Sequence, residues 1–124
     1  MNPAQPGAVG RGVWGEQLAE AVLLACGYAC LDRRCRTGGG EIDLVVRRGP
    51  VLAFVEVKTR RADGVAPPEF FIDAAKRRRV RRAAAAWLAA HPGQNAPQVR
   101  FDAVAVVHHG TAGGVDIRHL TGVF

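Results

Sequence analysis

The chain has 124 residues, 48% of them hydrophobic, and a formal net charge of +6 at pH 7. This length predicts one domain with a single core, and no apolar run approaches the roughly 20 residues that cross a bilayer. Residues 1–11 are rich in Pro and Gly and lack the features of a signal peptide. We therefore expect a cytoplasmic protein with a flexible N-terminus and one domain over residues 12–124. The positive charge favours nucleic acid as the partner, and a solvated basic surface is the simpler alternative.

The first predicted element is a helix from about residue 14 to residue 26, ended by Gly27, which suits a C-cap. Its apolar residues recur at helical spacing: Trp14, Leu18, Val22 and Ala25. Glu16 lies off this stripe, about 200° round the helical wheel from Trp14. A solvated acid is the simpler interpretation of Glu16, and a metal ligand reached from the helix is the alternative.

A short strand over residues 28–32 and a flexible glycine turn over residues 37–40 follow the helix. Three cysteines lie in this part of the chain: Cys26, Cys30 and Cys35. They fit a reducing compartment, but they lack the paired C-x-x-C spacing and the further ligands of a zinc site. We therefore interpret them as small packing residues.

Two strands, 41–47 and 51–59, form a predicted hairpin around the turn at 48–50. Asp43 on the first strand and Glu56 on the second interrupt apolar sequence. Burying such charge is costly unless something compensates it. If residue 48 pairs with residue 51, residue 43 lies opposite residue 56, with Cβ atoms roughly 4.5–5.5 Å apart. Two carboxylates at that separation can share one cation.

The register of this hairpin decides whether the two carboxylates meet. Pro50 fits poorly at the second central position of a tight turn, which leaves other registers open. A shift of two residues places Glu41 opposite Glu56, and a slip of one residue separates the acids unless a bulge restores them. In the first register Glu41 is expected to pair with Lys58. Alternation predicts one shared face for four residues: Glu41, Asp43, Val45 and Arg47.

The candidate site is therefore the pair Asp43 and Glu56, with Lys58 beside it. Mg²⁺ prefers oxygen ligands and commonly takes one or two carboxylates from a protein, and the backbone carbonyl of Val57 could add a third oxygen. Bound metal makes water a better nucleophile, and the Lys58 ammonium could orient that water or contact a phosphate. The alternative is a solvated hairpin face with ordinary Glu–Lys pairs.

Asp73 predicts the N-cap of a helix that runs to about Ala90 and ends at His91. One stripe of this helix carries four residues: Lys76, Val80, Ala83 and Trp87. Lys76 on an inward stripe either reaches the acidic site or extends to solvent. Arginines with no interleaved acid cover the rest of the helix and predict a phosphate-binding face, although most charge runs are simply solvated. They are Arg77, Arg78, Arg79, Arg81 and Arg82, and the face is extended by Arg33, Arg34, Arg36, Arg60 and Arg61.

Two further strands are predicted over residues 99–107 and 115–120, joined by a turn in which His108 and His109 are exposed. The two tryptophans, Trp14 and Trp87, lie on core stripes. Because few other aromatic residues are present, the sequence indicates no platform for stacking bases.

Three motifs in order resemble the bacterial YraN-like family: Gly12-x-x-Gly15-Glu16-x-x-Ala19, Gly40-Glu41-Ile42-Asp43-Leu44-Val45 and Phe54-Val55-Glu56-Val57-Lys58-Thr59-Arg60. Lys76, Arg100-Phe101-Asp102 and Val123-Phe124 also fit its pattern, so the resemblance covers nearly the whole chain after residue 10. The family is similar to PD-(D/E)xK nuclease-like proteins, near the archaeal Holliday-junction resolvases. The resemblance implies an α/β fold with a central mixed β-sheet flanked by helices, the restriction-endonuclease-like core. The active-site residues that it implies are Glu16, Asp43, Glu56 and Lys58, with Lys76 as a less certain addition.

The implied activity is a Mg²⁺-dependent endonuclease, with Mn²⁺ as a substitute, and the expected nucleic acid is DNA rather than RNA. Related resolvases act as dimers, which leaves a homodimer open. One departure is visible: the family commonly has Asn-x-Arg before its Gly-Glu-Ile-Asp motif, and this chain has Arg34-Cys35-Arg36. Two alternatives stay open: a non-catalytic nucleic-acid-binding module, and a basic scaffold that recruits a protein partner.

Overall fold

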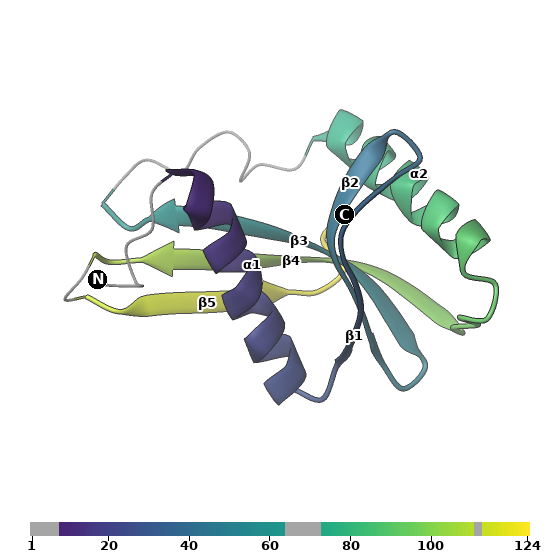
Figure 1. The fold of residues 1–124 in the computed structure, drawn as a ribbon, viewed down its shortest axis with the longest axis horizontal. Helices are drawn as coiled ribbons and strands as arrows, with labels where there is room; N and C mark the ends of the chain where they lie inside the picture. Colours follow the sequence, from purple (N-terminus) through teal and green to yellow (C-terminus); the bar gives the residue numbers. More distant parts are fainter. Residues whose placement is uncertain (1–7, 64–72, 111–112) are drawn as a thin grey trace.

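The computed structural model describes residues 8–63, 73–110 and 113–124, with side chains from residue 12 onward. Five strands form one sheet in the order β1-β2-β3-β4-β5, and two helices accompany it (Figure 1). The elements are α1 (Ala8–Ala25), β1 (Ala29–Thr37), β2 (Gly40–Arg48), β3 (Val51–Arg61), α2 (Ala74–Ala90), β4 (Gln98–His108) and β5 (Val115–Leu120). Neighbouring strands are antiparallel except β3 and β4, which are parallel and joined through α2. The predicted α/β fold with a mixed sheet flanked by helices is confirmed.

The two faces of the sheet pack against different helices. Ala19 and Leu23 of α1 join a cluster with strand residues from β2, β3 and β4, such as Val55. Trp87 of α2 belongs to a second cluster on Phe54, whose ring lies 5.6 Å from the indole, centroid to centroid. In Figure 1, α1 crosses in front of the sheet and α2 runs beside β2. Because each face is covered, β3 is apolar on both sides over most of its length.

Helix α2 begins and ends as the sequence predicts. The Asp73 carboxylate accepts a hydrogen bond from the Lys76 amide at 2.7 Å, and His91 is the C-cap. Val80, Ala83 and Trp87 are buried along the predicted stripe. The N-terminal helix differs, because α1 begins at Ala8. The expectation of flexible chain is therefore wrong for residues 8–11, while residues 1–7 lie outside the described part.

The turn at Gly49-Pro50 sets the hairpin register. Arg48 pairs with Val51, so only two residues form the loop, and Gly49 has φ +56°. A two-residue turn of type II′ needs a positive φ only at its first central position. At the second position φ is negative, which proline adopts. Pro50 is therefore compatible with the tight turn. The register is the one that places residue 43 nearest residue 56, and both shifted registers are excluded.

Several local expectations are wrong. Strand β4 extends to His108, which is buried against the Trp14 ring, because residues 107 and 108 still pair with β5; only His109 is exposed, and it contacts Asp116. Cys26 is exposed, whereas Cys30 and Cys35 pack against the clusters as expected. Residues 60 and 61 belong to β3 rather than to a loop, and residues 64–72 and 111–112 lie outside the description. None of the helices in the described ranges is long and apolar enough to span a membrane.

The turn between β1 and β2 touches α2, and this contact makes Gly38 sensitive to substitution. Gly38 has φ +60°, and a Cβ there would lie 2.8 Å from the Arg82 carbonyl oxygen and 3.0 Å from the Ala86 Cβ. Gly38→Ala is expected to lower the free energy of unfolding by roughly 1–3 kcal/mol, measured by urea denaturation. Gly39→Ala is the control, since Gly39 also has a positive φ but would place nothing within 4 Å of its Cβ. Equal losses at both positions would contradict a role for helix contact.

Candidate active site

Strands β2 and β3 separate at Asp43. Their last paired residues are Leu44 and Val55, one step before residues 43 and 56. Beyond that step, the Asp43 Oδ2 accepts a hydrogen bond from the backbone N–H of Val57 at 2.7 Å. The carboxylate thus satisfies a strand donor that the sheet leaves unpaired. This separation brings the carboxylate into the gap between two strands rather than onto a flat sheet face.

The alternation of faces along β2 breaks at the same residue. Ile42 and Val45 both belong to the cluster on the α2 side, whereas Leu44 belongs to the cluster on the α1 side. Residues three apart cannot share a face in a regular strand, since successive side chains alternate. The predicted shared face of Glu41, Asp43, Val45 and Arg47 is therefore wrong. The strand changes phase at Asp43, which aims its carboxylate between the layers.

Arg34 on β1 makes the matching distortion. The β1–β2 register passes from the pair of Arg33 and Leu44 to the pair of Cys35 and Ile42. Arg34 and Asp43, which lie between these pairs, are not paired with each other. Arg34 is the one non-glycine residue with a positive φ, +48°, in the described part of the chain. For a residue with a Cβ this conformation costs roughly 1–2 kcal/mol, and asparagine adopts it more readily. The backbone at Arg34 is therefore strained directly beside the candidate site.

Three neighbouring carboxylates act on Asp43 in this region. Burial raises the pKa of Asp43 to about 7, the Val57 N–H lowers it, and the negative charges of Glu56, Glu16 and Glu41 raise it further. Glu41 itself is exposed and lies nearest to Arg36, at 3.8 Å, so its predicted pairing with Lys58 is wrong. An acid with so high a pKa is partly protonated near pH 7, unless a bound cation neutralises its charge.

Two lysines hold Glu56. The Lys58 Nζ lies 2.7 Å from the Glu56 Oε1, and the Lys76 Nζ of α2 contacts the same oxygen. Burial lowers the pKa of Lys58, whose side chain is only 8% exposed. Burial alone would also lower the pKa of Lys76, but the Glu56 carboxylate holds it above its usual value. Of the two expected positions for Lys76, the structure shows the one at the acidic site.

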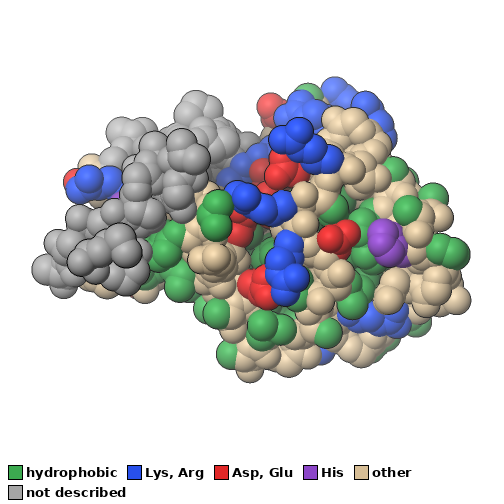
Figure 2. All heavy atoms as spheres, viewed as in Figure 1, with side chains coloured by type: hydrophobic (Ala, Val, Ile, Leu, Met, Phe, Trp, Pro, Cys, Tyr) green, Lys and Arg blue, Asp and Glu red, His purple; other side chains and the backbone are tan. Residues whose placement is uncertain are grey.

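Glu16 approaches from α1. Gly15 permits this approach, because a Cβ there would lie 2.0 Å from the Thr59 Oγ1 of β3. The Glu16 Oε2 lies 3.0 Å from the Arg34 Nε, and both residues line a cavity of about 140 Å³ together with Asp43. One turn later Glu20 pairs with Arg33 at 2.5 Å. Figure 2 shows acidic and basic side chains meeting in the middle of this face, between the two helices.

The carboxylates have the oxygen donors that a hard divalent cation prefers. In this structure, however, two of them are paired with lysine and arginine side chains. Carboxylate oxygens are the donors that Mg²⁺ prefers, and Asp43, Glu56 and Glu16 supply them. In the described ranges, however, no group of three potential ligands surrounds a common point. Glu56 contacts lysines and Glu16 contacts an arginine, so a metal would replace one of these cations. Val57 meets Asp43 through its N–H, and a role for its carbonyl oxygen stays a prediction.

The predicted phosphate-binding face is only partly a free surface. Arg77, Arg78, Arg79 and Arg82 are exposed along α2. Arg81 is different, because its Nη2 donates to the Phe124 backbone oxygen at 2.7 Å and its guanidinium lies over the Phe101 ring. It holds the C-terminal segment to the helix. Outside α2, Arg36 is 87% exposed, whereas the Arg60 Nη1 donates to the Arg61 carbonyl oxygen.

A buried charge network that sequence reasoning missed surrounds Asp102 on β4. Its carboxylate is fully buried and accepts from the guanidinium of Arg100, from the Gly122 N–H and from a ring nitrogen of His119 at 2.8 Å. Arg100 also donates to the Tyr28 hydroxyl at 2.6 Å. The Arg-x-Asp spacing in an otherwise apolar strand was the available signal. The network fixes the C-terminal segment and lies apart from the carboxylates of the candidate site.

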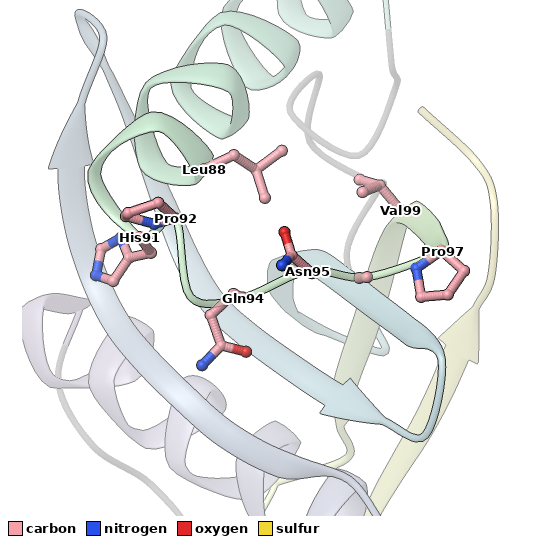
Figure 3. A pocket seen from close by; sticks show the side chains of 8 residues that line it. Leu88, His91, Pro92, Gln94, Asn95, Pro97 and Val99 are labelled. Atoms are coloured by element: carbon pink, nitrogen blue, oxygen red, sulfur yellow. The ribbon is translucent and has the colours of Figure 1, made fainter.

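A larger cavity of about 480 Å³ lies beyond the C-terminal end of α2 (Figure 3). Leu88, Pro92, Pro97 and Val99 form its apolar part, and two amides and His91 complete the lining. In Figure 3 these side chains surround the loop that leads into β4, and no carboxylate or amine lies among them. The chemistry of hydrolysis therefore points to the carboxylates, not to this cavity.

Comparison with known proteins identifies the family of the chain. A family model described as uncharacterised protein family UPF0102 matches residues 15–106. A UPF0102 protein of Methylorubrum extorquens is 52% identical over 109 residues, which cover 84% of each chain. One from Kineococcus radiotolerans is 42% identical over 112 residues, covering 90% of this chain and 91% of the relative, and one from Frankia alni is 45% identical over 118 residues, covering 94% of each. The chain belongs to the UPF0102 family, the YraN-like group of PD-(D/E)xK nuclease-like proteins.

Proposed function

We propose that this protein is a Mg²⁺-dependent endonuclease that hydrolyses phosphodiester bonds of DNA, including branched DNA. The observation that carries the proposal is the buried Asp43 carboxylate in the gap between β2 and β3, beside the Glu56–Lys58 pair. The pKa of Asp43 rises to about 7 beside three more acids, and perturbed acids of this kind cluster at functional sites. A divalent cation would stabilise such a cluster of acids, and a substrate phosphate would pair with its lysines. A nuclease meets both when it binds its substrate.

Each residue has a definite task in this proposal. Asp43 and Glu56 would hold the metal, which when bound activates water as a nucleophile and offsets charge on the transition state. If Glu56 were taken up by a metal, Lys58 would be released from that carboxylate and its ammonium could donate to an oxygen of the scissile phosphate. Lys76 lies on the same carboxylate from the α2 side and can contact a second phosphate oxygen. Buried ammonium groups of this kind act with little solvent screening.

A cleavage assay with a paired variant tests the proposal. Branched, flapped and duplex DNA are incubated with Mg²⁺ or Mn²⁺ and either the wild type or the double variant Asp43→Asn, Glu56→Gln. We expect cleavage by the wild type and a loss of at least about 10³-fold in the variant, since both ligands are removed. Arg118→Gln is the control, because Arg118 lies exposed on β5, outside the cavity that Glu16 and Asp43 line. Equal cleavage by the wild type and the double variant would refute metal-dependent catalysis at this site.

The exposed arginines of α2 are expected to anchor the phosphate backbone. Replacing Arg77, Arg78 and Arg79 with glutamine should weaken DNA binding in EDTA and reduce the slope of log affinity against log salt by roughly 2–3, since each lost phosphate contact removes about one released counterion. Fluorescence anisotropy at several salt concentrations measures both. A matched triple variant at Arg47, Arg48 and Arg118 removes the same net charge outside the predicted face. If both triple variants lose the same slope, net charge rather than this face binds DNA.

A non-catalytic nucleic-acid-binding module is the second candidate, and one observation favours it. Glu56 is already neutralised by Lys58 and Lys76, so the described residues form a stable ion cluster that needs no metal. This function predicts salt-sensitive DNA binding that Asp43→Asn leaves unchanged. It also predicts no heat of binding when Mn²⁺ is titrated into the protein. Calorimetry with Mn²⁺ therefore separates the two functions before any substrate is known.

A further inference from the structure

We propose that Arg34 acts as a built-in competitor of the divalent cation, holding Glu16 away from the metal site until a nucleic-acid phosphate draws the guanidinium aside. The inference rests on the proposed function and deepens it, since it assigns a control on metal loading. Arg34 binds Glu16, and no hydrogen bond or ion pair joins it to the Asp43 or Glu56 carboxylate. Arg34 is therefore a positioning residue in this proposal, and Glu16 is the ligand that it controls.

The contact between Arg34 and Glu16 has the geometry of an occupied cation site. The Arg34 Nε donates to both carboxylate oxygens of Glu16, at 3.0 and 3.3 Å. The Glu16 side chain is 13% exposed, whereas the Arg34 side chain is 53% exposed. The cation thus lies on the solvent side of the carboxylate, in the wall of the cavity that Asp43 also lines. A metal reaching Asp43 and Glu16 together must meet this guanidinium first.

The backbone aims Arg34 at this position. Arg33 pairs with Leu44 on the α1 side and Cys35 with Ile42 on the α2 side, so the strand turns over between them. The turn occurs at Arg34 itself, at φ +48°. Strained backbone beside a functional cluster is commonly part of the function. Here it sends two consecutive arginines to two acids on the same helix, Glu16 and Glu20.

Charge competition then couples metal and nucleic acid. With Arg34 on Glu16, a divalent ion finds Asp43 and Glu56 but not the third carboxylate. An exposed guanidinium binds phosphate well and can leave Glu16 when a phosphate offers two oxygens. Glu16 is then free for the metal, so DNA should raise metal affinity, and by linkage the metal should raise DNA affinity by the same factor. The substrate class that fits this device is a polyanion with a phosphate near β1.

A double-mutant cycle with Mn²⁺ as the probe tests the inference. Arg34→Asn removes the cation and keeps a residue that accepts the left-handed backbone. We expect calorimetry to show Mn²⁺ affinity raised roughly fivefold or more in Arg34→Asn relative to the wild type, and no such gain when Glu16→Gln is already present. Arg118→Asn is the matched control, because it removes one exposed arginine on β5, which is not part of the cavity that Glu16 and Asp43 line. That control should change Mn²⁺ affinity by less than about twofold.

The outcomes separate this inference from the proposed function. Unchanged or weaker Mn²⁺ binding in Arg34→Asn, or a gain that persists with Glu16→Gln, overturns the role of Arg34. An equal gain in Arg118→Asn also overturns it, because general electrostatics would then explain the result. If the cycle gives the expected coupling but no variant cleaves DNA, the inference stands and the nuclease proposal fails. Thermal melts of every variant confirm that the compared proteins are folded.

Discussion

Asp43→Asn is expected to stabilise the metal-free protein at pH 8 while abolishing its response to divalent cations. Burial and three neighbouring acids raise the pKa of Asp43 to about 7 in the folded chain, against about 3.9 for an unfolded aspartate. Because the folded pKa is raised, the contribution of Asp43 to stability is fully present below pH 3.9 and is lost as the pH rises towards 7. Asparagine keeps an oxygen that can accept from the Val57 N–H and cannot ionise. The variant should therefore gain up to about 4 kcal/mol over the wild type above pH 7 and little at pH 4.

Urea denaturation in EDTA between pH 4 and pH 8 measures this difference. Asp63→Asn is the control, because Asp63 is 71% exposed and pairs only with the exposed Arg61; its effect should stay below about 1 kcal/mol at every pH. Adding Mn²⁺ at pH 8 should raise the melting temperature of the wild type and not that of Asp43→Asn, since only the folded wild type binds the ion. A pH-independent difference between the wild type and Asp43→Asn would mean that the Asp43 carboxyl does not titrate abnormally.

Asp102→Ala is expected to cost about 3–5 kcal/mol of folding free energy, because it removes one partner of a buried ion pair. The substitution leaves the Arg100 guanidinium, with 17% of its side chain exposed, beside an empty space that held its buried partner. It also removes the acceptor for the Gly122 N–H and for His119. Chemical denaturation at pH 7 measures the loss. Asp116→Ala removes a carboxylate that is 81% exposed and should cost less than about 1 kcal/mol.

The two aspartates also predict opposite slopes of stability with pH. Burial alone would raise the pKa of Asp102, but Arg100, the Gly122 N–H and His119 together hold it below its usual value. Its stabilisation is therefore present above about pH 4, the unfolded pKa, and is lost as the pH falls through the folded pKa. If Asp102→Ala lowers the free energy of unfolding at pH 7 but not in strong acid, the result agrees with this sign. A loss as small as that of Asp116→Ala would show that the network contributes no net stability.

Local chemistry in the sequence predicted some elements accurately. Asp73 as an N-cap follows from rules that act within a few residues, and it is found. The pairing of residue 48 with residue 51 was one of the registers that the sequence left open, and it is the one observed. The strand β1 was predicted to end at residue 32, yet it runs to Thr37. Its polar residues find partners on distant elements, such as Glu16 and Glu20 on α1 and the Trp87 indole for Asp32. No local pattern contains those partners.

The candidate site shows the same division. Asp43, Glu56 and Lys58 could be chosen from spacing because their strands are neighbours in the chain. The phase change at Asp43 could not, because it depends on the left-handed backbone of Arg34, 9 residues away in sequence and across a strand. The pairing of Glu16 with Arg34 follows from the same distortion. Propensity rules that assume regular alternation miss such a site, because strain at a functional position departs from them.

Helix α2 carries Lys76 at the acidic cluster, a buried stripe on the sheet, and exposed arginines further along. These three groups belong to one rigid rod, so their separations are fixed by helical rise. Six residues from Lys76 to Arg82 amount to about 9 Å along the axis. A polyanion bound to the arginines of α2 would therefore meet the carboxylates at a fixed distance from those arginines.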